Sequence, residues 1–314
     1  MLAVNSLAVK SNKNRLMKQV LVGKIAPPVM FVEGGLMGAY VTTWDGKPKI
    51  GIGVGGIKYN VKVGDPCFGW PETEYLSPGA SFMGHEDSSE GSSYNMKGTA
   101  QAFVKYTAVG TKVTMVSGEG KGVEGVVTGK GGTGTSGKHV FVHFKKDDLE
   151  KLNLGDKAKF LQDGVGLEIQ GFEGRIFNMS PRFFDTLDLK MSGDALEFPV
   201  AKEIPAVCMG MGVGGSSAES GNWCIQSNPP HLVKKYGYGD LTIGDIVACR
   251  DVLMDYGKGY YRGAVTIGVV TCGASDVAGH GPGVMALASS KTGKIKPILT
   301  PDANIAKYLE LEAI

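Results

Sequence analysis

Strand-like alternation dominates the hydrophobic pattern of this chain. Residues 57–63 alternate apolar and polar side chains, residues 139–144 do the same, and both runs end at turn-forming residues. A longer apolar run over residues 264–272 leads into a glycine-rich loop. A period of two is typical of strands that bury one face, so these segments predict strands. We therefore expect a mainly β fold.

One turn motif recurs between the strand-like runs. An apolar–x–apolar triplet leads into Gly-Asp, and a further apolar run follows, at Gly64-Asp65, Gly155-Asp156 and Gly244-Asp245. Glycine supplies the positive φ of a tight turn, and aspartate bonds back to the turn backbone. The motif predicts tight turns that launch strands, as in small β-barrels. It gives most of these aspartates a purely structural role.

Helix signals are few and short. Ser180-Pro181 has the N-cap and first-turn proline signature before residues 182–187. Thr300-Pro301 repeats the signature before residues 305–311. Residues 146–152 predict one or two helical turns. Together with the strand pattern, this predicts a multi-domain architecture that is β-barrel-like or sandwich-like, with few short helices.

The domain boundaries are predicted from composition. The strand-like runs within residues 109–170, with a glycine-rich hairpin among them, would form a small inserted β-barrel. Residues 1–108 and residues 171–314 would together form the main β-rich domain.

Charge and cysteine content narrow the class of protein. The formal net charge of +2 gives no electrostatic case for nucleic acid or a membrane surface as a partner. The five cysteines are widely spaced, as in a cytosolic protein with reduced, buried thiols.

Residues 1–10 lack the order of a signal peptide, in which basic residues precede an apolar run. Residues 263–290 hold Asp276, His280 and many glycines, so we expect no membrane span and a cytoplasmic location.

Two glycine runs, residues 51–56 and 210–215, match the dinucleotide-binding fingerprint. That fingerprint needs a helix after it, because the pyrophosphate sits on the helix N-terminus, whereas a strand pattern or a polar loop follows here. A Walker-like run at residues 132–138 has His139 where Ser or Thr would hold magnesium. No nucleotide cofactor is therefore expected. Both fingerprint runs can still offer backbone N–H groups to an anion, and the candidate ligand-binding residues are Gly53, Gly55, Gly212 and Gly214.

The most distinctive run is a C-terminal loop, residues 278–283, in which three glycines and a proline surround His280. Such a backbone cannot continue a strand or a helix, and histidine exchanges a proton near neutral pH or binds a metal. His280 is therefore the candidate base or ligand, and Asp245 and Asp251 are catalytic candidates that would orient it. The loop also offers backbone donors to a ligand, at Gly281 and Gly283.

A second cluster of polar groups, His85-Glu86-Asp87, lies in a glycine- and serine-rich stretch. Histidine and carboxylates can hold a divalent metal, and the candidate ligands are His85, Glu86 and Asp276. The alternative is a solvated acidic loop at residues 85–90. The ligand spacing does not decide between metal binding and acid–base chemistry.

The remaining histidines and cysteines favour structural roles. Cys272 ends the strand before the His280 loop, where a Cys/His nucleophile pair competes with a buried thiol, the interpretation that composition favours. His139 and His143 would face the same side of a strand, about 13 Å apart and too far to share one metal.

Several stretches together resemble an uncharacterised bacterial and archaeal family, known only as a domain of unknown function of the 4438 type. The resemblance covers most of the chain and is most specific at residues 241–247 and 263–284; its other stretches are residues 76–81, 140–144, 163–167 and 205–212. It implies a β-rich, multi-domain architecture with a small barrel module. It implies no reaction and no catalytic residue.

Two functions stay open at this point. One is a metal-dependent or acid–base-dependent, hydrolase-like enzyme that acts on a small polar molecule in a cleft at His280. A divalent cation or an anionic metabolite would bind there. The other is a non-catalytic protein for ligand binding or assembly, whose glycine-rich loops form subunit contacts. A homo-oligomer is expected in either case. Convergence of His280, Asp251 and His85 on one pocket would favour the enzyme.

Overall fold

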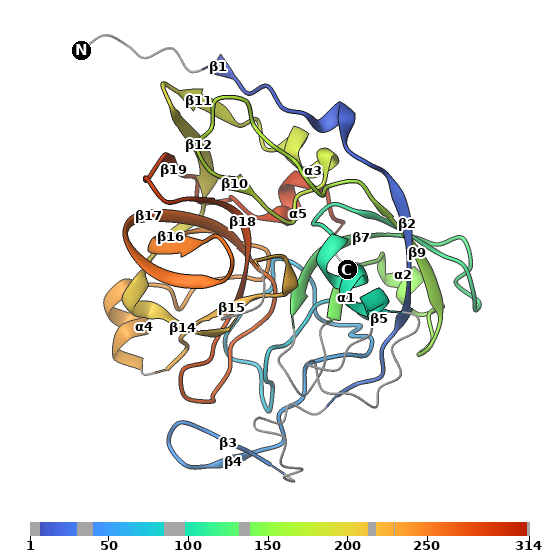
Figure 1. Ribbon diagram of the computed structural model, residues 1–314. Coiled ribbons are helices and arrows are strands. Elements are labelled where there is room, and N and C mark those ends of the chain that lie inside the picture. The colour runs from blue at the N-terminus through green and yellow to red at the C-terminus, as the bar shows by residue number, and fades with distance from the viewer. Residues whose placement is uncertain are drawn as a thin grey trace.

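Strands dominate the structure, a computed structural model of the chain (Figure 1). The description covers residues 7–29, 40–84, 98–131, 139–212, 218–228 and 230–312. The predicted mainly β class, with a closed barrel and few short helices, is confirmed. None of the described helices is long and apolar enough to cross a membrane.

Six strands close into a barrel in the order β2-β5-β8-β7-β6-β9. They are β2 (Gln19–Ile25), β5 (Ala80–Gly84), β6 (Lys112–Met115), β7 (Glu124–Gly131), β8 (His139–His143) and β9 (Lys157–Gln162). Strict alternation in β9 shows how the wall is built, because Ala158 and Phe160 are buried in the interior while Lys157 and Lys159 are exposed. The interior is filled by aromatic and branched side chains, and Phe82 meets Phe160 edge to face at 5.2 Å between ring centroids.

The barrel takes strands from beyond the predicted insertion. Its strands β6 to β9 lie within residues 109–170, whereas β2 and β5 come from before it. β2 closes the barrel by pairing antiparallel with β9 on one side and with β5 on the other. The boundaries of an inserted domain at residues 109 and 170 stay a prediction.

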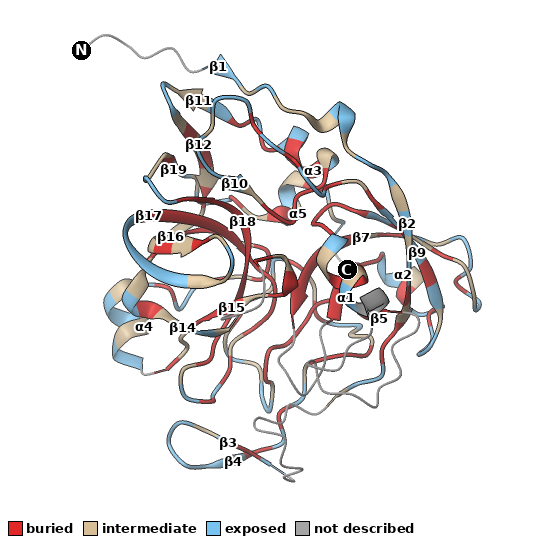
Figure 2. Cartoon of the chain, viewed as in Figure 1, coloured by how far each residue is buried: buried red, intermediate tan, exposed pale blue. Residues whose placement is uncertain are grey.

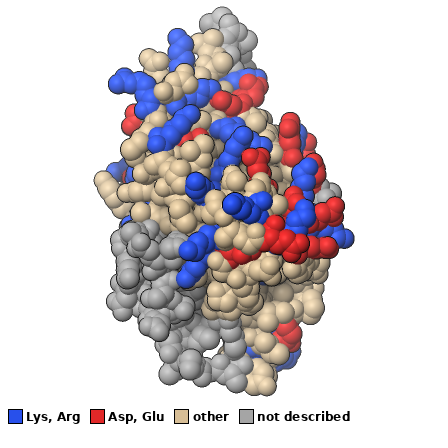
Figure 3. All heavy atoms as spheres, turned by 90° about the vertical axis from the view of Figure 1, so that its right-hand side faces the viewer, with Lys and Arg blue, Asp and Glu red and all other residues tan. Residues whose placement is uncertain are grey.

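The barrel side of the molecule carries both signs of charge (Figure 3). Lys157 and Lys159 project outward from β9, and acidic side chains gather along one edge of the same face. The two signs are therefore mixed on this face.

A larger sheet follows the barrel in the chain, in the order β13-β16-β17-β18-β15-β14, with β10 paired to β18. Its strands are β10 (Arg175–Ile176), β13 (Lys202–Pro205), β14 (Met209–Gly212), β15 (Trp223–Ile225), β16 (Ile246–Met254), β17 (Lys258–Val270) and β18 (Gly283–Ser290). β13 runs parallel to β16, and the other neighbours are antiparallel.

Both faces of the central part of the larger sheet are buried, whereas the first residues of β17, 258–263, are mostly exposed (Figure 2). Ile246 and Ala248 of β16 face one core, and the alternate residues Val247 and Cys249 face a second core that includes Trp223. The first core is shared with a four-stranded sheet of β1 (Leu7–Ala8), β11 (Lys190–Ser192), β12 (Ala195–Val200) and β19 (Ile295–Leu299). The two sheets thus form a sandwich beside the barrel. A separate hairpin consists of β3 (Val41–Thr42) and β4 (Pro48–Lys49).

The described helices are short. They are α1 (Gly98–Tyr106), α2 (Lys146–Leu149), α3 (Pro181–Thr186), α4 (Pro230–Tyr236) and α5 (Ile305–Tyr308), with 3-10 turns at Lys13–Arg15, Ala206–Cys208 and Ala218–Ser220. The Ser180 hydroxyl caps α3 by accepting the Phe183 N–H at 3.2 Å, as its signature predicts. α5 begins at the predicted Ile305, where Asn304 caps it by accepting the Ala306 N–H at 2.9 Å, but it ends at Tyr308, before Glu310 with its positive φ of 51°.

The Gly-Asp turns share one geometry. In each, an aspartate Oδ2 accepts a backbone N–H three residues earlier, from Lys62, Asn153 and Thr242, at 2.8, 2.9 and 2.8 Å. The three glycines have φ values of 101°, 87° and 97°. In each turn, the glycine N–H and the aspartate carbonyl also form hydrogen bonds to one and the same residue of a neighbouring segment. The glycine N–H donates to the carbonyl of that residue, and the aspartate carbonyl accepts its N–H. In chain order of the turns, these residues are Ile243, Ile25 and Val270. Two of the turns launch strands, β9 and β16, so the prediction of strand-launching turns holds at these two.

The prediction of a strand over residues 57–63 is wrong. Ile57 makes an isolated bridge to Ala80, and the chain then wraps around Gly79, which accepts the Lys58 N–H and donates to the Val61 carbonyl. The alternation arises because Val61 is buried in a loop, and a strand is not required to bury it.

Candidate functional site

A small apolar cluster lies where the barrel meets the larger sheet. Its members come from β3, from the loops between β4 and β5, from β8, from β15 and from the chain after β17: Val41, Val54, Tyr75, Phe141, Cys224, Cys272 and Val277. Junctions between domains are common places for ligand sites. We call this region the junction site.

His280 lies beside this cluster and is buried, with 2% of its surface exposed. Its Nδ1 is hydrogen-bonded to the hydroxyl of Tyr75, and the two ring centroids are 5.6 Å apart. The same hydroxyl lies 3.3 Å from Sγ of Cys224. The structure therefore pairs the predicted histidine with a tyrosine.

Tyr75 has an unusual backbone conformation. Its φ is 52°, a left-handed value that costs a bulky residue energy. The conformation is held by its own N–H, which donates to the Ala274 carbonyl at 3.1 Å, and by the preceding Glu74 N–H, which donates to Ile52 at 2.9 Å. Strain of this kind is concentrated at functional sites.

The loop around His280 is held firmly. The His280 carbonyl accepts the backbone N–H of Ser227 at 2.9 Å and its hydroxyl at 3.1 Å. Gly281 has no room for a side chain, because a Cβ there would lie 1.7 Å from the Ile225 carbonyl oxygen. A Cβ on Gly283 would lie 2.8 Å from Sγ of Cys272. Of these two predicted ligand-binding glycines, Gly281 packs against β15, and Gly283 is the first residue of β18, where it pairs with Cys224.

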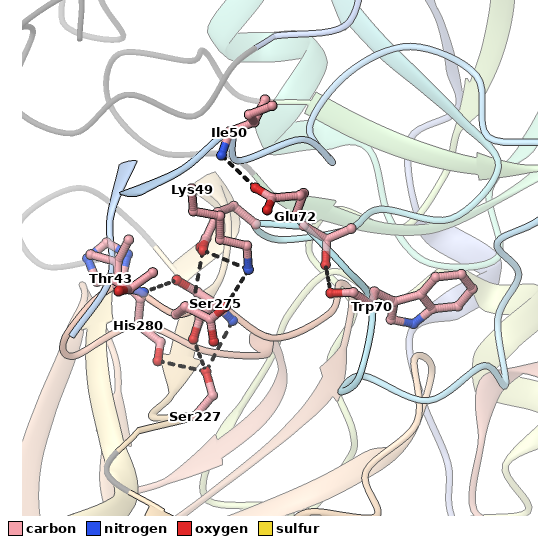
Figure 4. A network of polar contacts seen from close by, with 12 residues as sticks. Thr43, Lys49, Ile50, Trp70, Glu72, Ser227, Ser275 and His280 are labelled. Carbon is pink, nitrogen blue, oxygen red and sulfur yellow. Dashed lines mark hydrogen bonds and ion pairs between the residues drawn. The ribbon is translucent and has the colours of Figure 1, made fainter. Parts of the chain in front are cut away.

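A charged group adjoins the tyrosine. Glu74 is fully buried and Lys49 is 8% exposed, with 3.5 Å between Nζ and Oε1. Lys49 also pairs with Asp276, whose side chain is 53% exposed, and the Asp276 N–H donates to Oε1 of Glu74 at 3.0 Å. Figure 4 shows Lys49, Ser275 and His280 within one network of polar contacts.

Glu74 is only partly satisfied by these contacts. Its Oε2 accepts no hydrogen bond of normal geometry from the residues that the structure describes. Burial raises the pKa of the Glu74 carboxyl, and the Ser275 hydroxyl, the Asp276 N–H and Lys49 oppose that rise. A buried carboxyl with a raised pKa and an open acceptor holds a proton to a higher pH than an ordinary glutamate does.

The other two catalytic candidates, Asp245 and Asp251, accept hydrogen bonds from neighbouring groups of the fold. Asp245 accepts hydrogen bonds from the Thr242 hydroxyl at 2.8 Å and from the Asn304 amide at 3.0 Å, which ties a Gly-Asp turn to the C-terminal helix. Asp251 accepts the Gly263 N–H at 2.7 Å, at the irregularity in β16. Of the three aspartates singled out, Asp276 is the one that the structure brings to the junction site.

The described residues of the two predicted glycine loops have different neighbours. The Gly53 carbonyl accepts the Ser77 N–H at 3.2 Å, and a Cβ on Gly55 would lie 2.2 Å from the Pro27 carbonyl oxygen. Gly212 ends β14, where it pairs with Trp223. Gly214, His85 and Glu86 lie outside the described residues.

The cysteines are all buried and free, as composition predicted. Burial raises the pKa of the Cys272 thiol to about 12, and it also raises the pKa of Cys224. A protonated, buried thiol is a poor nucleophile, so these values count against the Cys/His pair.

Within the described residues, no group of three or more His, Cys, Asp and Glu side chains is placed to hold a metal ion. Two of the three predicted ligands lie outside those residues, so the metal site stays a prediction.

Sequence reasoning missed Lys49, Glu74 and Tyr75. They match no motif, and they come together only because the β3–β4 hairpin and the loop before β5 both pack on the His280 loop. The left-handed backbone conformation of Tyr75 cannot be recognised from its residue type, because tyrosine rarely adopts a positive φ.

The barrel, the sandwich and their junction define a two-domain, mainly β protein with buried titratable side chains between its parts. The chain belongs to the family described as domain of unknown function DUF4438, whose N-terminal model matches residues 40–185 and whose C-terminal model matches residues 186–309. A solved structure titled "Crystal structure of TM1086" is similar, with 36% sequence identity and a TM-score of 0.84. The match covers 96% of this chain and 99% of that one. No curated protein matches the chain.

Proposed function

We propose that the protein is an acid–base enzyme, hydrolase-like or lyase-like, that acts on a small polar molecule at the junction site. The observation that carries the proposal is the placement of consecutive residues. Glu74 brings a buried carboxyl to Lys49, and Tyr75 brings a hydroxyl to His280. Two proton-exchanging groups of different chemistry thus meet at one junction.

Glu74 would act as the base. Its raised pKa moves proton transfer toward neutral pH, and its open Oε2 would accept a hydrogen bond from a hydroxyl or amine of the substrate. Lys49 would stabilise negative charge that develops in the reaction, in a site where a low dielectric strengthens its effect.

The Tyr75–His280 pair would hold or pass a second proton. Burial raises the pKa of Tyr75, which keeps the phenol neutral. A neutral phenol that donates to Nδ1 leaves the imidazole proton on Nε2. His280 would then act as an acid of fixed tautomer toward a group on the substrate.

Substrate would approach through the exposed side of the site. Asp276 is half exposed while Glu74 is buried behind it, and Lys49 links the two. A substrate that displaces the Asp276 carboxylate from Lys49 would gain access to Glu74. Such a ligand would itself carry an acceptor for Lys49 and a donor for Glu74.

The test is consumption of substrate from a mixture. A panel of small hydroxy acids, amides, esters and amino compounds is incubated with the wild-type protein and analysed by mass spectrometry. We expect one compound to be consumed, and its turnover to fall by about 100-fold or more in Glu74→Gln. The matched control is Asp45→Asn, which changes a carboxylate of a surface ion pair on the β3–β4 hairpin that carries Lys49. Equal turnover in Glu74→Gln and wild type, or consumption of no compound, would refute the proposal.

A non-catalytic assembly role is the second candidate, and one observation favours it. The β16–β17 hairpin exposes three tyrosines, Tyr256 at 85%, Tyr260 at 72% and Tyr261 at 43%. Exposed aromatic residues are enriched at protein interfaces. This candidate predicts a homo-oligomer in light scattering that dissociates in Tyr256→Ser and Tyr260→Ser variants.

A further inference from the structure

Lys58 is a cationic residue with neutral partners. Its Nζ donates to the Gly55 carbonyl and, at 2.9 Å, to Oγ of Ser77. Both acceptors are uncharged, and no carboxylate is paired with Lys58 among the described residues. The residue is partly exposed. An ammonium group held in this way gains little that offsets its loss of hydration.

Two buried serines continue the arrangement. Ser77 Oγ lies 3.2 Å from Oγ of Ser81 and 3.1 Å from the Gly53 carbonyl, and both serines are fully buried. Ser81 belongs to β5, where it is paired with Phe141 on β8. The hydroxyls thus stand on the outer wall of the barrel, on the side of the junction.

A histidine lies on the same wall of the barrel. His139 lies two residues before Phe141 on β8, so both side chains leave the strand on the same side. Its Nδ1 is buried and has no hydrogen-bond partner among the described residues. Burial, and next the positive charge of Lys58, lower the pKa of His139 to about 4. The charge of Lys58 therefore acts on His139.

We propose that Lys58, beside Ser77 and Ser81, is a reactive amine that captures a small aldehyde or ketone as an imine. This inference does not depend on the proposed function, because none of these residues belongs to the Glu74 and His280 cluster.

The chemistry follows from the surroundings of the amine. Burial lowers the pKa of Lys58 to about 7, so about half of the molecules carry a neutral amine near pH 7. Its lone pair would attack the carbonyl carbon and form a carbinolamine. Loss of the former carbonyl oxygen and two protons as water then gives the C=N bond. Ser77 would hydrogen-bond the oxygen that leaves, and no oxidant or reductant is needed.

Reductive trapping tests the proposal on the folded wild-type protein. Acetaldehyde and sodium cyanoborohydride are added near pH 7, and ethylation of each lysine is followed by peptide mass spectrometry. The exposed Lys121 and Lys159 are internal references. An ordinary lysine is neutral in only about one molecule in 2,500 near pH 7, so Lys58 should react at least about ten-fold faster even with restricted access.

Variants separate reactivity from a structural role. Lys58→Met should abolish the label at this position. Ser77→Ala removes an acceptor that favours the charged amine, so it should move the pH midpoint of Lys58 labelling below that of the wild type. His280→Gln should leave the labelling unchanged, which keeps this test separate from the proposed function.

The proposal is overturned if Lys58 reacts no faster than Lys121, or if its rate rises only in the alkaline range of an ordinary lysine. The site-resolved pH profile of the wild-type protein decides the matter even if Lys58→Met does not fold.

Discussion

The hydroxyl of Tyr75 is hydrogen-bonded to Nδ1 of His280, a residue 205 positions away in the chain. The contact joins the loop before the barrel strand β5 to the glycine-rich loop before β18. A bond between two buried residues of such separation fixes the two parts of the molecule relative to each other. It also gives the predicted histidine a partner that sets its tautomer.

Removing this hydroxyl should destabilise the protein. Tyr75→Phe is expected to lower the free energy of unfolding by about 1–3 kcal/mol, because a buried polar contact is lost. Urea denaturation measures the change. Tyr256→Phe, at an 85% exposed position, is the control and should change stability by less than about 0.5 kcal/mol. Equal effects of the two substitutions would contradict the described contact.

The His280 loop should tolerate a methyl group at one glycine and reject it at another. Gly281→Ala places a Cβ 1.7 Å from a backbone oxygen, and we expect a loss of more than about 3 kcal/mol or no soluble protein. Gly279→Ala meets no heavy atom within 4 Å and carries only the strain of a φ of 77°, about 1 kcal/mol. Thermal denaturation of both variants checks the order, and the reverse order would show that the loop packs differently.

The aspartates of the Gly-Asp turns should contribute to the stability of the protein and not to its activity. Asp65→Ala, Asp156→Ala and Asp245→Ala each remove a hydrogen bond to a turn N–H and should cost about 0.5–2 kcal/mol. Asp245→Ala should cost the most, because it also loses Asn304. Turnover of any identified substrate should stay unchanged in the folded variants. A folded Asp245→Ala protein without activity would restore Asp245 as a catalytic residue.

Acid should destabilise the protein through two barrel histidines. Burial lowers the pKa of His139 and of His143 from 6.5 to about 4. The unfolded chain therefore binds these protons more tightly, and stability is lost as the pH falls from 6.5 toward 4, by roughly 3 kcal/mol for each histidine. Urea denaturation at stepped pH should show a shallower loss in His143→Leu. The exposed His231 supplies the control, since His231→Gln should keep the wild-type slope.

Local chemistry in the sequence predicted the parts of the fold that depend on neighbours in the chain. The Gly-Asp turns, the Ser180 cap and the strand at residues 139–143 rest on contacts within a few residues. Closure of the barrel by β2 was not predicted, because its pairing with β9 joins residues more than 130 positions apart. The alternation of apolar and polar residues over 57–63 predicted a strand that is absent there. A loop that buries Val61 produces the same sequence pattern as a strand.

The site was predicted only in part for the same reason. His280 stood out because glycines and proline around a histidine are rare in strands and helices. Asp276 was a candidate because it precedes that loop. Glu74 and Tyr75 have no local signal, and their importance comes from burial, a strained φ and contacts made across the fold. The Asp245 and Asp251 carboxylates accept backbone N–H groups, and their catalytic role stays a prediction.

The titration of Glu74 tests the central claim most directly. The protein is labelled with ¹³C at glutamate side-chain carboxyls, and the Glu74 resonance is assigned by its absence in Glu74→Gln. We predict a midpoint clearly above the ordinary value of 4.5, because burial disfavours the charged carboxylate of a base poised for proton transfer. A midpoint at or below 4.5 would show a permanently ionised partner of Lys49, and would contradict the acid–base role of the junction site.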